Sequence, residues 1–241
     1  MGTTVKNIEK ILKSQYSNDN FVEFVEEVFD SVRLVAPNKL HEEHNLYSSH
    51  ILGYSHIGDY STFDSKKVSI FAVKLSKQDY VVKSRGVQRN YARKLIEAGN
   101  SDAAVIAFYC EDGSSWRLSF VRLDYEMTFE NGKFSSAAKI TPAKRYSFLV
   151  GEGEPCHTAI SRFHNFIIDK NYSPTVDELE EAFSVERVTK EFFELYKEKY
   201  YDLYEYLSSN KDFMSESTRC GFTVEQFAKK LLGQIVFLYF I

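Results

Sequence analysis

The sequence predicts a mixed α/β fold followed by a helical region. Two nearly continuous apolar runs, 67–75 and 103–109, have the length of buried strands, and a segment with helical periodicity lies between them. From about residue 157 the three- and four-residue apolar spacing of helices dominates. We therefore expect an α/β domain over 1–156 and a helical region over 157–241.

The part of the chain before the first buried strand is predicted to contain helix and extended structure. Apolar residues at helical spacing predict a helix over 4–33, which the polar run 17–20 breaks into two pieces. The segment 46–60 is rich in Tyr, Ser and Ile and is predicted to be extended. A turn at 62–66 then leads into the strand at 67–75.

The rest of the α/β part is predicted to contain a helix and two more strands. Residues 84–98 have the pattern of a helix that Gly99 ends. Apolar and polar residues alternate over 116–129 with one change of phase, so we expect a single strand with a bulge near residue 120. A last strand is predicted at 146–150.

The helical region carries clear helix start signals. Capping boxes at 175–178 and 223–226 pair a threonine with a glutamate or glutamine three residues later. Between them, 189–207 carries aromatic residues at helical spacing. The final apolar run, 234–241, stops without a C-cap, which suggests that the sequence is a fragment of a longer protein.

Charge and cysteine content restrict the expected setting and partners. The formal net charge is −4, so any contact with nucleic acid must come from a local basic patch. The 3 cysteines are far apart and predict neither a zinc knuckle nor a disulfide framework, which favours the reducing cytoplasm. No apolar run approaches the ~20 residues of a membrane span, so no membrane partner is expected.

The strand at 67–75 ends in a lysine, and the following helix carries a glutamine and arginines, which is the frame on which one large nuclease class builds its metal site. A strand that presents an acid, a spacer and a lysine places both functional side chains on one face. Lys74 is present, and Asp59 and Asp64 lie upstream as candidate acids. The acid position two residues before the lysine, however, is Ala72.

The missing acid makes this catalytic site degenerate, and no metal ligands are assigned. Mg²⁺ needs hard oxygen ligands, which Glu43 or Glu97 could supply from a helix. The alternative is that Lys74 only ends a core strand. Lys74, Asp64 and Asp59 are therefore kept as candidate remnants of a nuclease site.

The helix after the strand carries the better candidate for binding. Arg85, Arg89 and Arg93 are spaced by four residues and share one face, and Gln88 lies beside that face. Three aligned guanidinium groups on one helix face make a natural contact with a phosphate backbone. The alternative interpretation is a solvated helix face with salt bridges to other helices.

Two further patterns have simpler explanations. Gly151 and Gly153 follow a strand and precede a helix, as in a dinucleotide loop, but the glutamates beside them would repel a pyrophosphate, so a tight turn is preferred. Four histidines form a local cluster without the spacing of a zinc motif, and surface positions are the default. These histidines are His41, His44, His50 and His56.

Several segments in the same order resemble one protein family. They are KVSIFAVKL at 67–75, QRNYAR at 88–93, WRLSFV at 116–121, TPAKRYSFLVG at 141–151, FSVERVTKEFF at 183–193 and FAKKLLGQIVFLY at 227–239. Together they resemble the N-terminal region of large single-chain type II, type IIG-like, restriction-modification enzymes, also called type II restriction enzyme methylase subunits. The resemblance covers nearly the whole chain.

The resemblance implies a fold, partners and cofactors. It implies a PD-(D/E)xK nuclease-like core over 1–156, in which Lys74 and Gln88 match the motif and Ala72 replaces its acid. It implies double-stranded DNA as a partner and makes 157–241 a helical connector toward a downstream methyltransferase domain that uses S-adenosylmethionine. This chain has no Asn-Pro-Pro-aromatic motif of adenine methyltransferases.

Three hypotheses follow for the function of this chain. The first is a nuclease-like domain that contacts DNA and is catalytically degenerate. The second is an active Mg²⁺-dependent endonuclease with a relocated acid. The third is a non-catalytic interaction module that docks the methyltransferase domain.

Overall fold

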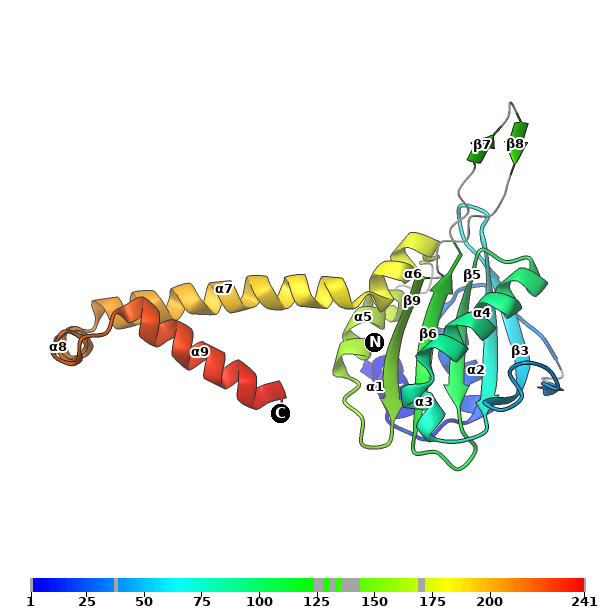
Figure 1. The fold of residues 1–241 in the computed structure, drawn as a ribbon, viewed down its shortest axis with the longest axis horizontal. Helices are drawn as coiled ribbons and strands as arrows, with labels where there is room; N and C mark the ends of the chain where they lie inside the picture. The colour runs from blue at the N-terminus through cyan, green and yellow to red at the C-terminus, as the bar shows by residue number, and fades with distance from the viewer. Residues whose placement is uncertain are drawn as a thin grey trace. The chain divides into compact units, whose positions relative to one another are not determined.

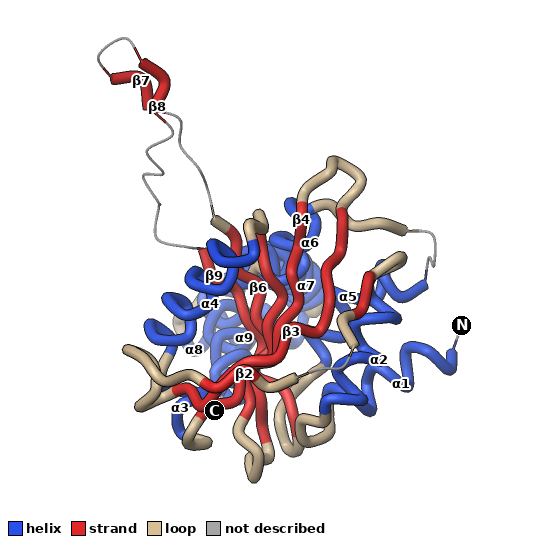
Figure 2. Tube along the Cα trace, turned by 90° about the vertical axis from the view of Figure 1, so that its right-hand side faces the viewer, coloured by secondary structure: helices blue, strands red, loops and turns tan. Residues whose placement is uncertain are grey.

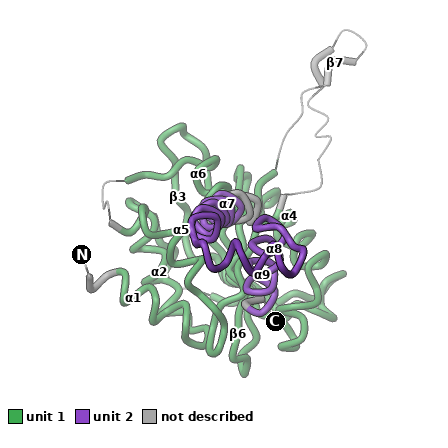
Figure 3. The backbone as a smooth tube through the Cα atoms, turned by 90° about the vertical axis from the view of Figure 1, so that its left-hand side faces the viewer, with its two compact units in different colours: residues 1–184 green, residues 185–241 purple. Residues whose placement is uncertain are grey.

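The structure is a computed structural model, and it describes residues 2–36, 39–123, 128–130, 133–135, 144–168 and 172–240. The chain divides into two compact units, Met1–Ser184 and Val185–Ile241 (Figure 3). The first unit is built on one large sheet with helices, and the second consists of helices. The mixed α/β class predicted from the sequence is therefore confirmed.

A seven-stranded sheet lies at the centre of the first unit (Figure 1). Its strands follow the order β1-β3-β4-β5-β6-β9, and β2 also pairs with β3. Neighbouring strands are antiparallel except β4 and β5, which are parallel. The strands are β1 Arg33–Leu34, β2 His41–Glu42, β3 Ile51–Ser61, β4 Lys67–Leu75, β5 Ala103–Tyr109, β6 Ser115–Arg122 and β9 Lys144–Gly151. A separate hairpin pairs β7 Thr128–Glu130 with β8 Lys133–Ser135.

Helices cover both faces of this sheet (Figure 2). One face packs against α1, α2, α5 and α6, and the other packs against α3 and α4. These helices are α1 Gly2–Leu12, α2 Asn18–Val28, α3 Asp79–Lys83, α4 Arg85–Gly99, α5 His157–Ile168 and α6 Val176–Phe183. Because β4 is covered on both faces, its apolar run is nearly continuous.

The alternation of side chains along β4 assigns them to two separate cores. Ile70 and Ala72 belong to the core under α1, α2, α5 and α6. Phe71 and Val73 belong to the core under α3 and α4. Side chains two residues apart share a face, so Lys74 lies on the face of Ala72. Lys74 and the side chains that α4 packs onto the sheet therefore lie on opposite faces.

Several predicted elements agree with the structure. The strands predicted at 67–75 and 103–109 are β4 and β5. A break separates α1 from α2 as expected, but it lies earlier than the predicted run 17–20, because α1 ends at Leu12 and α2 already begins at Asn18. The extended segment predicted over 46–60 is shorter at its start, because β3 begins at Ile51. The two strand predictions rest on apolar runs that the local sequence shows directly.

The helix predicted at 84–98 ends differently from the expectation. Gly99 remains in α4, and Asn100 takes the left-handed conformation at φ 48° and ψ 52° that closes the helix. Asparagine tolerates this region because its short side chain adds little steric cost there. The short helix α3, just before α4, was not predicted.

The single bulged strand predicted over 116–129 is wrong. Strand β6 ends at Arg122, and its register with β5 and β9 runs without a shift. Both faces of β6 are buried, so an apolar residue fits on either side and a change of phase needs no bulge. Residues 124–127 lie outside the described residues.

Helices α5 and α6 belong with the sheet. The sequence predicts a boundary between residues 156 and 157, whereas the compact units divide between Ser184 and Val185. Phe163 of α5 packs edge-on against Phe24, with ring centroids 5.5 Å apart, and Phe183 of α6 stacks on Phe120 at 5.7 Å. These rings fill the core beneath the sheet, so the first unit extends to residue 184.

The segment after β9 is a tight turn. Gly151 has φ 127° and Gly153 has φ 83°. A Cβ atom on Gly151 would approach the carbonyl oxygen of Ser114 to 2.4 Å, so only glycine fits there. The tight turn preferred from the sequence is therefore confirmed.

The second unit contains three helices, α7 Val185–Ser209, α8 Lys211–Cys220 and α9 Val224–Phe240. An aromatic cluster of Phe213, Phe222 and Phe227 joins α8 to the start of α9, with ring centroids 5.1–5.9 Å apart. Thr223 and Gln226 exchange the reciprocal bonds of the predicted capping box. The box at 175–178 is also present, at the start of α6 in the first unit.

Candidate functional site

Lys74 pairs with one acidic residue of the described chain, and that partner was not predicted. Its Nζ donates a hydrogen bond to Oε2 of Glu111, in the turn after β5. This hydrogen bond raises the pKa of Lys74, which therefore stays charged. Strand register places Lys74 beside Tyr109 at the end of β5, so the turn that follows β5 brings Glu111 within reach.

The two predicted acids lie at the other end of the strand. Asp59 pairs in register with Ser69, five positions before Lys74. At about 3.3 Å per residue this separates them by roughly 16 Å along the sheet. Asp64 lies beyond that end and accepts a hydrogen bond from Thr62 in the turn between β3 and β4. The structure therefore does not bring Asp59 or Asp64 together with Lys74.

Asp59 is instead the centre of its own hydrogen-bonded group. Its Oδ1 accepts a bond of 2.7 Å from the Ser69 hydroxyl, contacts Nε2 of His56 at 3.1 Å, and lies 3.4 Å from Nζ of Lys67. Burial alone would raise the pKa of Asp59, but the Ser69 hydrogen bond and the charges of His56 and Lys67 lower it overall. These partners indicate a structural role for Asp59 within the sheet, between β1 and β4.

The two glutamates that the sequence analysis offered as substitutes for the missing acid form ion pairs with other residues. Ala72 itself is 1 % exposed in the core under α1 and α2. Glu43 pairs with Lys94 at 2.6 Å, and Glu97 pairs with Arg93 at 2.8 Å. Of the carboxylates in the described residues, only Glu111 is within ion-pair distance of Lys74.

The three arginines of α4 differ in their exposure and in their ion-pair partners. Arg93 is paired with Glu97 one turn along the same helix. Arg85 is exposed and Arg89 half-buried, and the described part of the chain offers neither side chain a carboxylate within ion-pair distance. The solvated, salt-bridged interpretation therefore fits Arg93, whereas Arg85 and Arg89 remain available for an anion.

Gln88 is completely buried, whereas the sequence placed it beside a DNA-binding surface. Its amide nitrogen donates to the carbonyl oxygens of Tyr80 at 2.6 Å and Val81 at 3.2 Å. Its amide oxygen accepts a bond of 2.6 Å from Nη2 of Arg145. Gln88 therefore links α3 and α4 to strand β9 and cannot touch DNA from this position.

Two further arginines, which the sequence did not assign, lie under α3 and α4. Arg117 of β6 is 4 % exposed and donates from Nε to the carbonyl of Val81 at 2.8 Å. Its Nη1 also donates to the Ser147 hydroxyl at 3.1 Å. Arg145 of β9 donates to Gln88 and, at 3.2 Å, to Ser119. We call Arg85, Arg89, Arg117 and Arg145 the arginine cluster.

The arginine cluster is electrostatically unfavourable by itself. Burial, followed by the charges of Arg117, Arg85 and Arg89, lowers the pKa of Arg145 to about 9. Burial and the charge of Arg85 also lower the pKa of Arg117. Both groups stay protonated at neutral pH. Within the described ranges, none of the four forms an ion pair with a carboxylate.

The sequence contained a partial signal for this cluster. Arg117 and Ser119 alternate with Trp116, Leu118 and Phe120, which shows that the two polar residues share one face of a strand. A polar face normally predicts solvent exposure. Only the covering helices, which the local pattern does not reveal, bury this face.

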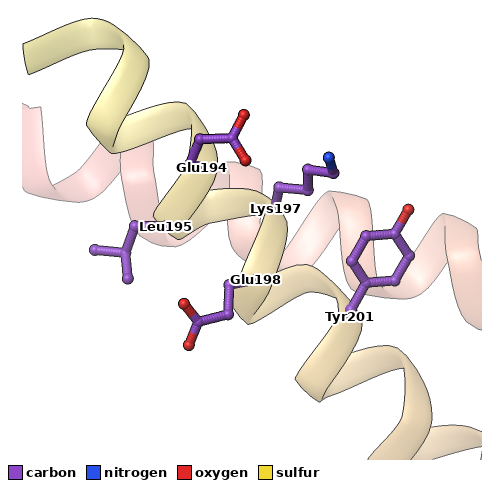
Figure 4. A pocket seen from close by; sticks show the side chains of 5 residues that line it. All are labelled: Glu194, Leu195, Lys197, Glu198 and Tyr201. Atoms are coloured by element: carbon purple, nitrogen blue, oxygen red, sulfur yellow. The ribbon is translucent and has the colours of Figure 1, made fainter. Parts of the chain in front are cut away.

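Other candidate positions do not form a site. The four histidines have separate partners, such as Tyr54 stacked on His41 and Asp59 bonded to His56. Among the residues that the structure describes, no three metal-ligating side chains gather. A hollow of about 350 Å³ on α7 is lined by residues of that helix alone (Figure 4). These residues are Glu194, Leu195, Lys197, Glu198 and Tyr201.

Comparisons with known proteins do not identify this chain. No protein-family model matches it, and no curated protein or solved structure matches it significantly. Across the described helices, none is both long and apolar enough to cross a bilayer.

Proposed function

We propose that the α/β unit is a DNA-contacting, nuclease-like domain that holds duplex DNA and does not cleave it. The single observation that carries this proposal is the arginine cluster, in which Arg85 and Arg89 reach the surface with no carboxylate of the described residues within ion-pair distance. Guanidinium groups bind phosphate oxygens with matched, charge-assisted hydrogen bonds. Because the net charge is −4, this local excess of positive charge stands out.

The environment of Lys74 supports the absence of cleavage. Metal-assisted phosphodiester cleavage needs several oxygen ligands around the metal ion. Lys74 has Glu111 as its acidic neighbour, Ala72 lies in an apolar core, and Asp59 and Asp64 are at the far end of the strand. This arrangement leaves Mg²⁺ short of ligands.

The family resemblance supplies the biological context of the proposal. A restriction-modification enzyme of the type IIG kind would place a DNA adenine methyltransferase domain, with S-adenosylmethionine as its cofactor, downstream of this chain. In that context the α/β unit would add affinity for double-stranded DNA in the cytoplasm. The strand β4, in which Lys74 is the residue before the last, followed by α4 with Gln88, is the part of the fold that supports this context.

Salt-dependent DNA binding tests the proposal directly. Replacing both Arg85 and Arg89 by Gln is expected to weaken duplex binding and to lower the slope of log K against log[salt] by about 2, since each lost phosphate contact removes about 0.9. Arg93→Gln is the matched control, because Arg93 is already paired with Glu97. Fluorescence anisotropy over a salt series measures both quantities.

The outcome of this experiment is decisive in either direction. An unchanged affinity and slope in the double variant would exclude α4 as the DNA-contacting surface. An equal loss of DNA affinity in Arg93→Gln would show that the three arginines act only through the overall charge of the chain.

An active nuclease is the second candidate, and the contact between Lys74 and Glu111 is the observation that favours it. In this case Glu111 would be the relocated acid. Cleavage of DNA with Mg²⁺ or Mn²⁺ should then disappear in both Lys74→Ala and Glu111→Gln. Absence of cleavage by the wild-type chain with either ion removes this candidate.

The second unit supports a docking function beside the first proposal. Helix α7 exposes Phe193 and Leu195, and α9 exposes Phe237 and Leu238. Large apolar side chains exposed at neighbouring positions mark protein interaction surfaces. If the implied methyltransferase domain binds here, adding it should slow amide hydrogen exchange in α7 and α9, and unchanged exchange would refute the contact.

A further inference from the structure

We propose that Arg85, Arg89 and Arg145 form a binding site for one phosphate group at the N-terminal end of α4, with Gln88 as its positioning residue. The inference deepens the proposed function and rests on it in taking the phosphate to belong to a nucleic acid. A free phosphate ion has the same chemistry and serves as the probe.

The first support is positive charge that has no ion-pair partner among the described residues. Two of the cluster's arginines are removed from water to different extents, since Arg117 is 4 % exposed and Arg145 is half-buried. Buried charges are normally paired, because removing an ion from water is costly. Around these arginines the described chain supplies hydroxyl, amide and carbonyl oxygens, but no carboxylate within ion-pair distance. A bound anion would supply the missing negative charge.

The second support is unused hydrogen-bonding capacity. A guanidinium group has five N–H donors. The three bonds of Arg145 use both hydrogens of Nη2 and one of Nη1, and Nε is buried without a partner. The side chains of Arg85 and Arg89 make no hydrogen bond to the described residues. Arg85 and Arg89 are thus the direct ligands available at the surface, with Arg145 behind them.

The third support is the end of the helix at which these side chains gather. The first backbone N–H groups of α4 have no partner within the helix, and the Ser84 side chain makes no capping bond to them. A Cβ atom on Gly86 would meet nothing within 4 Å, so the first turn is open. Free N–H groups and the helix dipole add to the attraction that the arginines exert on an anion.

Gln88 acts through Arg145. Its oxygen accepts from Nη2 of Arg145, while its nitrogen is held by the carbonyls of Tyr80 and Val81. The side chain is therefore fixed at both ends, and it fixes the plane of the Arg145 guanidinium behind the surface arginines. A neutral amide does this without cancelling the positive charge, which a glutamate at this position would do.

Titration with inorganic phosphate at constant ionic strength tests the site. Isothermal titration calorimetry on the full chain should show saturable binding. Arg89→Gln and Arg145→Gln should each weaken it by roughly tenfold or more, since both remove a charge-assisted interaction. Arg145→Lys keeps the charge but not the planar group, and should weaken binding less than Arg145→Gln. Arg93→Gln should leave it unchanged.

Gly86 offers a test that leaves every arginine in place. Gly86→Asp puts a carboxylate three residues before Arg89, within reach of its guanidinium, and should also weaken phosphate binding by roughly tenfold. Gly86→Ala adds only a methyl group in open space and should leave affinity within about twofold. Both variants should fold at least as well as wild type, because an acid or an alanine suits the first turn of a helix better than glycine.

Duplex DNA with and without a 5′-terminal phosphate distinguishes the source of the ligand. Competition by both duplexes supports a backbone phosphate, and competition only by the phosphorylated duplex supports a terminal one. Phosphate binding without DNA binding would keep the site and refute the proposed function. DNA binding that inorganic phosphate does not compete with, and that Gly86→Asp and Arg145→Gln leave intact, would refute the site and keep the proposed function.

Discussion

The replacement of Gln88 by Leu tests whether this residue anchors the arginine cluster. Leucine has a similar volume, so the change leaves little cavity and removes mainly hydrogen bonds. Arg145 would lose its 2.6 Å bond to the Gln88 oxygen, and the carbonyl of Tyr80 would lose its 2.6 Å donor. The carbonyl of Val81 would keep a partner, since Arg117 donates to it at 2.8 Å.

The size of the effect follows from these lost bonds. A hydrogen bond to a charged group contributes about 1.5–3 kcal/mol, and a neutral one about 0.5–1.5 kcal/mol. We therefore expect Gln88→Leu to lower the free energy of unfolding of the α/β unit by about 2–4.5 kcal/mol. Because the interaction with Arg145 is shared, the double variant with Arg145→Leu should be less destabilised than the sum of the two single variants, by about 0.5–3 kcal/mol.

Urea denaturation measures this difference. The chain has 1 tryptophan, and Trp116 lies in β6, so its fluorescence reports on the α/β unit. The midpoint should fall while the m-value stays constant. Asn90→Leu, the same chemical change at an exposed position of α4, should alter stability by less than about 0.5 kcal/mol. Equal stability of the two variants would refute an anchoring role for Gln88.

Three other predictions concern residues elsewhere in the α/β unit. Ala72→Glu should fail to restore cleavage and should destabilise the fold by several kcal/mol, about the effective cost of burying an unpaired carboxylate, as measured by urea denaturation. Burial would raise the pKa of Glu43, but the hydrogen bond from Lys94 lowers it overall. The contribution of ionised Glu43 to folding stability should therefore be fully present above its unfolded pKa of 4.5. This contribution should be lost as the pH falls through the lower pKa of the folded state. A Glu43→Gln variant with an unaltered pH profile of unfolding would contradict this. Thr175→Ala should cost about 1 kcal/mol by loss of the capping box, whereas Thr175→Ser should retain the stability.

The pattern of apolar residues was sufficient to predict the elements whose burial pattern is simple. Strands β4 and β5 are buried on both faces, so their apolar runs could be read directly with correct limits. The capping box at Thr175 is a local signal with a local cause, and it is present. The same approach gave a wrong prediction for β6. Because both faces of β6 are buried, a change of phase in its apolar pattern does not indicate a bulge in the strand.

The candidate site could be predicted only in part, because its geometry depends on strand pairing. The register of the β3–β4 hairpin places Asp59 opposite Ser69, and nothing in the local sequence fixes that register. Gln88 is buried because α3 and the face of β9 that carries Arg145 cover it, and neither contact could be inferred from α4 alone. Helical spacing correctly grouped Arg85 with Arg89 but could not show that Arg93 is neutralised by Glu97.

The arginine cluster and Lys74 lie on opposite faces of the sheet, so phosphate binding and any cleavage would take place at separate sites. Lys74 and Ala72 share the face covered by α1 and α2, whereas Arg117 and the helix α4 lie on the opposite face. A phosphate held by Arg85 and Arg89 is therefore kept from Lys74 by the thickness of the sheet and its packed side chains, and adjacent layers are about 10 Å apart. A phosphate bound at the arginine cluster cannot at the same time be the one that Lys74 and Glu111 would act on. Lys74→Ala should therefore abolish any cleavage without changing DNA affinity, and a loss of DNA affinity in Lys74→Ala would contradict this arrangement.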